Sequence, residues 1–151
     1  MRVVVASDHA GFALKQHVAV TLRDAGHDVV DVGADSEEPV DYPQFAAAAA
    51  RLVADGEVDG GVVVCGSGVG VSIVANKIPR VRAVNAHDAE EAALARRHND
   101  VNVVALAGRR LTPDAADRIV VAFLQTDFEG GRHARRVAAI ERQMTESNVN
   151  E

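Results

Sequence analysis

The amino-acid sequence predicts an α/β fold in which a five-stranded parallel sheet carries helices on both of its faces. Short Val-rich runs of strand length alternate along the chain with segments whose apolar residues recur at helical spacing. Such an alternation is typical of parallel strands joined by crossover helices. A glycine-rich turn at residues 66–70 joins one strand run to one helix run. Together these observations indicate a Rossmann-like, doubly wound arrangement, and the 151 residues suit a single domain spanning 1–151.

The five expected strands are short and mostly apolar, as buried parallel strands are. They are Arg2–Ser7, Asp28–Val32, Gly60–Cys65, Val81–Val84 and Val101–Leu106.

The expected helices are marked by start and stop signals. Leu14, Val18, Leu22 and Ala25 recur at helical spacing, and Gly26 follows as a stop. After a polar loop at 33–43, Pro43 suits the first turn of a helix that reaches Ala54.

Four more helices are expected after this one. A short helix should reach about Lys77, and Asp88 with Glu91 resembles a capping box for a helix to about His98. Thr112-Pro113 should begin a helix that ends near Gln125. The last helix should follow Gly130-Gly131, and the polar tail at 145–151 is expected to fray.

Composition argues against several classes of partner. Asp and Glu outnumber Lys and Arg by 22 to 16, and aromatic residues are only 3%, so neither a basic face nor a stacking platform for nucleic acid is expected. The longest apolar runs are strand-length, so no membrane span is expected. The N-terminus lacks signal-peptide features and the chain has one Cys, which together indicate a cytoplasmic protein without an internal disulfide. The basic run 132–136 suits one small anion better than a polymer.

Ligands of open parallel sheets bind beyond the carboxyl ends of the strands, which here directs attention to the loop at 66–70. Its glycines allow several backbone N–H groups to face an anion. Val71 stands where a dinucleotide fingerprint needs its third Gly, and no Gly-Lys-Ser/Thr of a P-loop follows. The alternative is a tight strand-to-helix turn without a ligand.

The same rule singles out Cys65, at the end of the third strand, and the pair Asp8-His9, at the end of the first. A Cys65 thiolate beside an anion nest could remove a proton from carbon, whereas a buried structural Cys is the alternative. Asp8 and His9 could hold sugar hydroxyls or a phosphate, although Asp8 could equally serve as a helix cap.

Three residues on helices complete the set of candidates. His98 ends a helix, where a protonated imidazole is favoured and could act as a general acid; Asn99 could instead be the C-cap. Arg132 and Arg136 share one helix face and could grip a phosphate, or they could form a solvated basic surface.

The other histidines are interpreted as surface or local structure: His17, His27, His87 and His133. No His or Cys spacing predicts a zinc site, so no metal is expected.

Taken together, these segments resemble the ribose-5-phosphate isomerase B family, which also includes the galactose-6-phosphate isomerase subunits. The resemblance runs from Arg2 to about Arg142. It is carried by Ser7-Asp8-His9-Ala10-Gly11-Phe12, Asp41-Tyr42-Pro43, Gly60-Gly61, Cys65-Gly66-Ser67-Gly68-Val69-Gly70, Ala75-Asn76-Lys77, Arg96-Arg97-His98-Asn99-Asp100 and Gly130-Gly131-Arg132-His133.

The resemblance implies an aldose–ketose isomerase that needs no metal or cofactor. By resemblance, Cys65 is the base that moves a proton between C1 and C2 through an enediolate, whereas another branch of the family uses a Glu nearby. Ser67 stands where the family usually has Thr and keeps the hydroxyl. His98, assisted by Asp8, is expected to open the sugar ring.

The remaining site residues follow from the same resemblance. The backbone of Gly66, Gly68, Val69 and Gly70 is expected to hold the enediolate oxygen. His9, Arg132 and Arg136 are expected to bind the phosphate, and Tyr42, Asn99 and Arg109 to line the site. Family members are homodimers or tetramers whose site is shared between subunits, so such an assembly is expected here. The base, the nest and the phosphate grip are all expected at one edge of the sheet.

The expected reaction is the interconversion of ribose 5-phosphate and ribulose 5-phosphate. Two alternatives stay open at this point. The chain could be a sibling isomerase for a tetrulose 4-phosphate or for allose or galactose 6-phosphate, because the residues do not fix the carbon count. It could also be a non-catalytic phosphate-binding module, because a fold alone does not determine function.

Overall fold

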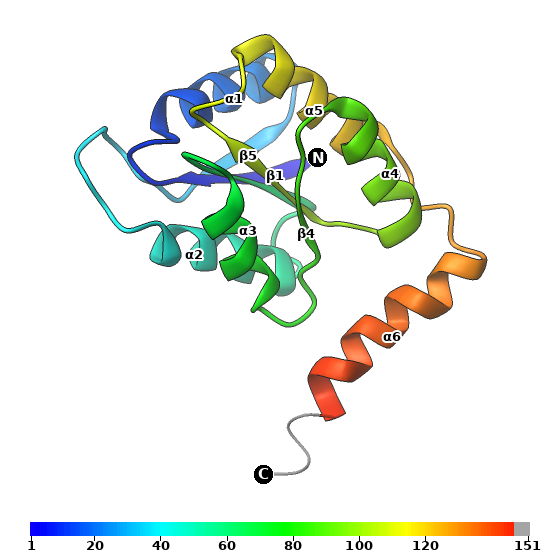
Figure 1. Cartoon of the computed structure of the whole chain (residues 1–151). Helices are drawn as coiled ribbons and strands as arrows, with labels where there is room; N and C mark the ends of the chain where they lie inside the picture. Colours follow the sequence, from blue (N-terminus) through cyan, green and yellow to red (C-terminus); the bar gives the residue numbers. More distant parts are fainter. Residues whose placement is uncertain (147–151) are drawn as a thin grey trace.

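The computed structural model describes residues 1–146 and contains the predicted five-stranded parallel sheet, with strand order β2-β1-β3-β5-β4 (Figure 1). The strands are β1 (Arg2–Ser7), β2 (Asp28–Asp31), β3 (Gly60–Cys65), β4 (Ala83–Asn85) and β5 (Val103–Ala107). The helices of this part of the chain are α1 (Phe12–Asp24), α2 (Tyr42–Ala54), α3 (Val69–Asn76), α4 (Ala89–Asn99), α5 (Pro113–Gln125) and α6 (Arg132–Glu146).

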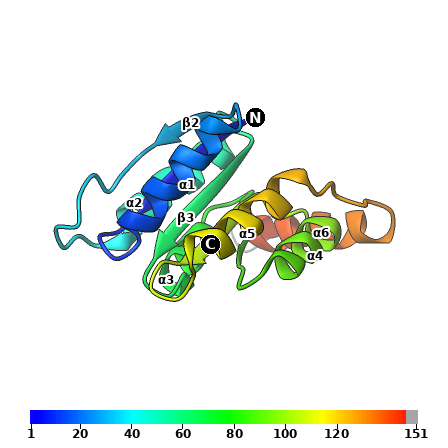
Figure 2. The ribbon, with the colours of Figure 1, turned by 90° about the horizontal axis from the view of Figure 1, so that it is seen from above.

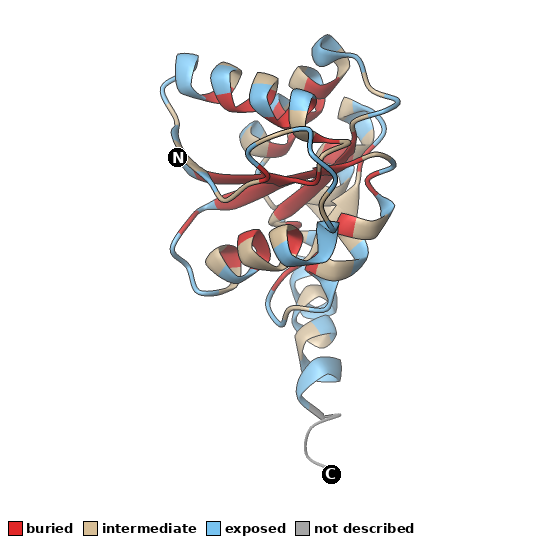
Figure 3. Cartoon of the chain, turned by 90° about the vertical axis from the view of Figure 1, so that its left-hand side faces the viewer, coloured by how far each residue is buried: buried red, intermediate tan, exposed pale blue. Residues whose placement is uncertain are grey.

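Two apolar clusters, one on each face of the sheet, form the core (Figure 3). Side chains of α1, α4 and α5 pack on one face, and those of α2 and α3 pack on the other. The three central strands β1, β3 and β5 are almost completely buried, because helices cover them on both sides. The doubly wound arrangement predicted from the sequence is therefore confirmed.

The fourth strand begins later than predicted. The sequence placed it at Val81–Val84, whereas β4 spans Ala83–Asn85. The backbone N–H of Val81 closes a turn onto Ile78 O at 3.1 Å, and that of Arg82 donates to Asn102 Oδ1 at 2.8 Å. Because both groups are already paired, the ladder with β5 starts at Ala83.

The capping signals read from the sequence form real hydrogen bonds. Thr112 Oγ1 accepts from Ala115 N at 3.1 Å, and Asp88 Oδ1 accepts from Glu91 N at 2.8 Å. Glu91 reaches back to His87 N at 2.7 Å, one residue before the position that an ideal capping box would use. Positions 145 and 146, which were expected to fray, belong to α6, and the rest of the predicted tail lies outside the described residues.

The last helix stands away from the body of the molecule (Figure 1) and lies beside α4 (Figure 2). Glu141 fastens it by an ion pair with Arg82 Nη1 at 2.8 Å and by accepting from Arg80 N at 3.0 Å. Ile140 and Met144 nevertheless stay exposed on α6. No helix within residues 1–146 is long and apolar enough to cross a membrane.

Candidate active site

A cavity of about 650 Å³ opens at the carboxyl ends of β1, β3 and β5. This is the sheet edge where ligands of such folds bind. Its lining comprises Asp8, His9, Ala10, Tyr42, Cys65, Gly66, Ser67, Val69, Gly70, Ile73, Arg109 and Arg110. Nine of these residues were predicted from the sequence. Ala10, Ile73 and Arg110 were not, although the adjacency of Arg110 to Arg109 was a signal that could have indicated it.

Cys65 is the last residue of β3 and is only 4% exposed. Two backbone bonds join the segment after it to the turn after β5: Gly108 N donates to Cys65 O at 2.8 Å, and Arg109 N donates to Gly66 O at 3.1 Å. A Cβ on Gly66 would lie 3.1 Å from Arg109 Nη1, so the absence of a side chain there lets the guanidinium lie against the loop. The thiol and the Arg109 guanidinium therefore share the cavity.

The glycine loop leads directly into the N-terminus of α3. Gly68 has φ +76°, a conformation that favours glycine, and is the N-cap of the helix that begins at Val69. Ser67 Oγ accepts from Val69 N at 3.2 Å, which leaves the hydroxyl proton of Ser67 able to donate to a ligand. A Cβ on Gly70 would meet the Tyr42 ring at 2.6 Å, so this glycine makes room for the ring. The helix start favours negative charge in this part of the cavity.

Asp8 and His9 form another wall of the cavity. Asp8 is buried, and its Oδ1 accepts from Gly11 N at 3.0 Å, which orders the turn before α1. The N-cap of that helix is Gly11, so Asp8 supports the helix start without being its cap. The Nδ1 atom of His9 lies 3.1 Å from Val40 N and 3.2 Å from Val40 O. Because Val40 occupies Nδ1, the other ring nitrogen of His9 is the one available to a ligand.

His98 belongs to a second cluster, formed by the end of α4 and the start of α6. It stacks on His133, with ring centroids 4.4 Å apart and an interplanar angle of 14°. His133 is 6% exposed, so its interpretation as a surface residue is wrong, whereas a role in local structure agrees with this stacking. The C-cap of α4 is Asp100 in the left-handed conformation, so Asn99 is the last helical residue and not the cap.

The electrostatic surroundings of His133 favour its neutral form. Burial lowers the pKa of His133 below its usual value, and the positive charges of His98, Arg132 and Arg136 lower it further. Glu129, whose Oε2 lies 3.6 Å from His133 Nε2, acts in the opposite direction.

Ligand-type atoms of His98, Glu129 and His133 lie within 4.8 Å of one another. One pair, Glu129 Oε2 and His133 Nε2, is 3.6 Å apart, and ligands of a tetrahedral zinc ion lie roughly 3.3 Å apart when metal–nitrogen bonds are about 2.0 Å long. Arg132 Nε also lies 3.4 Å from His133 Nε2, which places positive charge beside the cluster. The expectation that no metal takes part stays a prediction.

The structure does not bring all predicted site residues together within one chain. Five of them are absent from the lining of the cavity: Gly68, His98, Asn99, Arg132 and Arg136. Gly68 still lies in the loop between two lining residues, whereas the other four lie on α4 and α6. The crossover helix α4 runs from the carboxyl end of β4 back to the amino end of β5, so its last turn lies at the opposite edge of the sheet. The expectation that every part lies at one edge is therefore wrong for a single chain. The direction of the crossover was a signal that could have predicted this.

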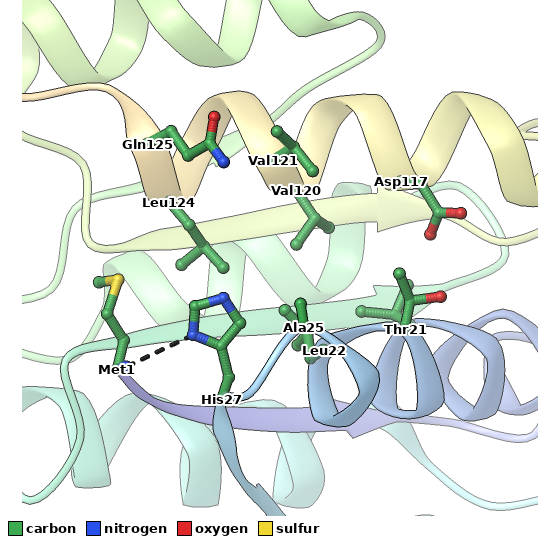
Figure 4. Close-up of a pocket in the computed structure, with 11 residues that line it drawn as sticks. Met1, Thr21, Leu22, Ala25, His27, Asp117, Val120, Val121, Leu124 and Gln125 are labelled. Atoms are coloured by element: carbon green, nitrogen blue, oxygen red, sulfur yellow. Dashed lines mark hydrogen bonds between the residues drawn. The ribbon is translucent and has the colours of Figure 1, made fainter.

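A second cavity of about 200 Å³ lies between α1 and α5 (Figure 4). Leu22, Val120 and Leu124 give it a mainly aliphatic wall, and His27 Nδ1 lies 3.4 Å from the Met1 ammonium at its side. Such a wall offers no grip for a phosphate. We therefore assign the candidate site to the cavity beside Cys65.

Comparisons with known proteins agree with this geometry. A family profile described as Ribose/Galactose Isomerase matches residues 3–140. Ribose-5-phosphate isomerase B from Escherichia coli is 45% identical over 92% of this chain and 93% of its own length. The solved structure of ribose-5-phosphate isomerase B from Clostridium thermocellum superposes with a TM-score of 0.96 at 41% identity, covering 97% of this chain and 99% of that one.

The relative from Mycoplasma genitalium was solved with bound ribulose-5-phosphate. It superposes with a TM-score of 0.91 at 39% identity over 96% of this chain and 97% of that one. The match of the family profile to most of the chain, together with these full-length relatives, shows that the chain belongs to the ribose/galactose isomerase family.

Proposed function

We propose that this protein interconverts ribose 5-phosphate and ribulose 5-phosphate, without a metal or cofactor, in the cytoplasm. The observation that carries the proposal is the placement of the Cys65 thiol beside a glycine loop and the start of α3, in one cavity with Arg109. A relative of the same fold has been solved with ribulose-5-phosphate bound. A base next to an oxyanion-stabilising loop is the arrangement that enediolate chemistry requires.

In the proposed reaction, the Cys65 thiolate removes the proton from C2 of the open-chain aldose and returns it to C1. The carbonyl oxygen at C1 gains negative charge as the enediolate forms, and backbone N–H groups of the glycine loop stabilise it. The hydroxyl proton at O2 moves to O1, so that the carbonyl ends at C2. Ser67 is suited to assist at these oxygens, because its hydroxyl proton is not used within the loop.

We also propose that each site is completed by a second copy of the chain. His98, Asn99, Arg132 and Arg136 would come from the partner subunit, where His98 would open the ring and the arginines would bind the phosphate. The opposite position of these residues within one chain supports this. So do the exposed apolar side chains on both surfaces, namely Ile140 and Met144 on α6 and Val69 and Ile73 beside the cavity.

The substrate assignment is tested by measuring turnover with phosphorylated tetroses, pentoses and hexoses under identical conditions. We expect the highest kcat/KM with ribose 5-phosphate. A higher value with a tetrulose 4-phosphate, allose 6-phosphate or galactose 6-phosphate would identify a sibling isomerase. Binding of these sugars without any turnover would instead identify a phosphate-binding module.

The shared site is tested by mixing two inactive variants, Cys65→Ala and His98→Asn, under conditions that allow subunits to exchange. Random pairing makes about half of the dimers mixed, and each mixed dimer has one intact site, so roughly a quarter of the wild-type activity should return. If each site were built within one chain, no intact site would form. Confirmed exchange without recovered activity would contradict the shared site but not the isomerase assignment.

A further inference from the structure

Two buried side-chain atoms among the described residues lack a hydrogen-bond partner: Ser7 Oγ and Asn85 Oδ1. Unpartnered buried polar atoms are rare and call for an explanation. Asn85 ends β4, the edge strand beside β5, and its side chain reaches the glycine loop that follows β3. Its Nδ2 donates to Ser67 O at 3.2 Å. Its Oδ1 lies against Gly68, where a Cβ would come within 2.3 Å of it.

The hydrogen bond from Asn85 to Ser67 O orients the whole peptide unit that joins Ser67 to Gly68. The carbonyl of Ser67 and the N–H of Gly68 belong to one peptide unit, which is planar and, like nearly all peptide units, trans. In such a unit the C=O and the N–H point in opposite directions. Because the C=O is held on the side of Asn85, the Gly68 N–H must point away from Asn85.

The cavity lies on that other side of the loop. Four residues of the loop line it, namely Gly66, Ser67, Val69 and Gly70, whereas neither Asn85 nor Gly68 does. An N–H of Gly68 that points away from Asn85 is therefore directed toward the side on which its two neighbours line the cavity. Gly68 has φ +76°, and glycine permits several orientations of the flanking peptides, so this residue alone would not select one. The side-chain amide of Asn85 selects one orientation of the Ser67–Gly68 peptide.

We propose that Asn85 is a positioning residue that orients the Ser67–Gly68 peptide, so that the Gly68 N–H faces the substrate and stabilises the enediolate oxygen. The inference rests on the proposed isomerase function. Asn85 does not touch the substrate and acts only through the loop. Its unpartnered Oδ1 follows from this arrangement, because the amide is turned to give its N–H to Ser67 and leaves its oxygen facing a glycine without a donor.

Two substitutions test the proposal in different ways. Asn85→Leu removes the donor, so the peptide loses its preferred orientation. Asn85→Asp puts an acceptor-only group there, which repels Ser67 O and favours a flipped peptide whose N–H turns toward Asp and away from the substrate. Asn102→Asp is the matched control, because Asn102 donates its Nδ2 to a backbone carbonyl, Arg80 O, at 2.9 Å near the other end of β4.

Wild-type turnover of ribose 5-phosphate is measured first, and its absence would overturn the proposed function. If the wild type turns the substrate over, Asn85→Leu should lower kcat about tenfold and Asn85→Asp about 100-fold. The first loss is smaller than the loss caused by deleting one oxyanion donor, and the second is close to it. KM should change less than twofold, because the interaction forms mainly in the transition state. Asn102→Asp should keep its kcat.

A planar hydroxamate analogue of the enediolate gives an independent measurement. Its inhibition constant should rise in both Asn85 variants by the factor by which kcat falls, whereas inhibition by inorganic phosphate should not change. The proposal is overturned if the folded Asn85→Leu variant keeps its kcat within twofold of the wild type, or if Asn102→Asp loses as much. If Asn85→Asp does not fold, the kcat of Asn85→Leu and its inhibition by the hydroxamate still test the proposal.

Discussion

The two groups of candidate site residues lie in regions that the rest of the fold holds in place to very different degrees. The Cys65 cavity is built on the ends of β1, β3 and β5, whose side chains are buried on both faces of the sheet. The group with His98 and Arg136 lies at the end of α4 and on α6, a helix that stands away from the body (Figure 1). In the proposed mechanism, the proton-transferring base is held by the buried sheet. His98 and the two arginines would instead be placed by a neighbouring subunit.

The largest expected effect is the loss of chemistry when the cavity loses its base. Cys65→Ala should bind the substrate but lower kcat by at least ~10²–10⁴-fold, because a positioned base contributes about that much to proton transfer. Exchange of the transferred hydrogen with solvent deuterium should stop as well, which NMR can follow. Turnover near the wild-type rate would exclude Cys65 as the base.

The rigidity of the loop beside the cavity is tested at its most crowded glycine. A Cβ on Gly68 would lie 2.3 Å from Asn85 Oδ1 and 3.1 Å from the backbone of Leu106. Gly68→Ala should therefore lower kcat by roughly 30-fold, because the loop that holds the oxyanion must move. Gly56 also has a positive φ, but a Cβ there meets nothing within 4 Å. Gly56→Ala shares the backbone strain and should keep its kcat, so equal losses in both would refute a role specific to the loop.

On the helical side, the expected loss concerns binding. Arg136→Ala should raise KM for the phosphorylated sugar about tenfold with a smaller change in kcat, because a charge-assisted contact to the phosphate is lost. Arg135, its exposed neighbour on α6, provides the matched control. If Arg135→Ala raises KM as much, the effect reports only the net charge of the helix and not a specific phosphate contact.

The smallest expected effect is on the pH dependence of stability. The fold lowers the pKa of His133, so below the usual His pKa of about 6.5 the unfolded chain binds a proton that the folded chain refuses. Stability should therefore rise with pH through this range and fall on acidification. His133→Phe keeps a flat ring against His98 but cannot titrate, and it should flatten the plot of Tm against pH between 5 and 7. His87→Phe changes an exposed histidine that also pairs with a glutamate, and it should leave the slope unchanged.

Local signals in the sequence predicted local structure well. β1 and β3 begin and end as predicted, because Val-rich runs bounded by polar residues or glycines leave few choices. The prediction erred where side chains from elsewhere intervene, as at Arg82, whose backbone is bound by Asn102. For the candidate site, nine of the predicted residues line one cavity. The stacking of His133 on His98 could not be foreseen, because helical periodicity says which residues share a face but not where the helix docks.

The contact between His9 and Val40 has a consequence for the tautomer that His9 presents to a ligand. Val40 presents both its N–H and its C=O to Nδ1 of the imidazole, at 3.1 and 3.2 Å. An unprotonated Nδ1 can accept from the N–H, and a protonated one can donate to the C=O, so either form finds a partner without turning the ring. The far nitrogen, Nε2, therefore keeps its position in either tautomer. The ring can offer a ligand a donor or an acceptor at Nε2 without turning.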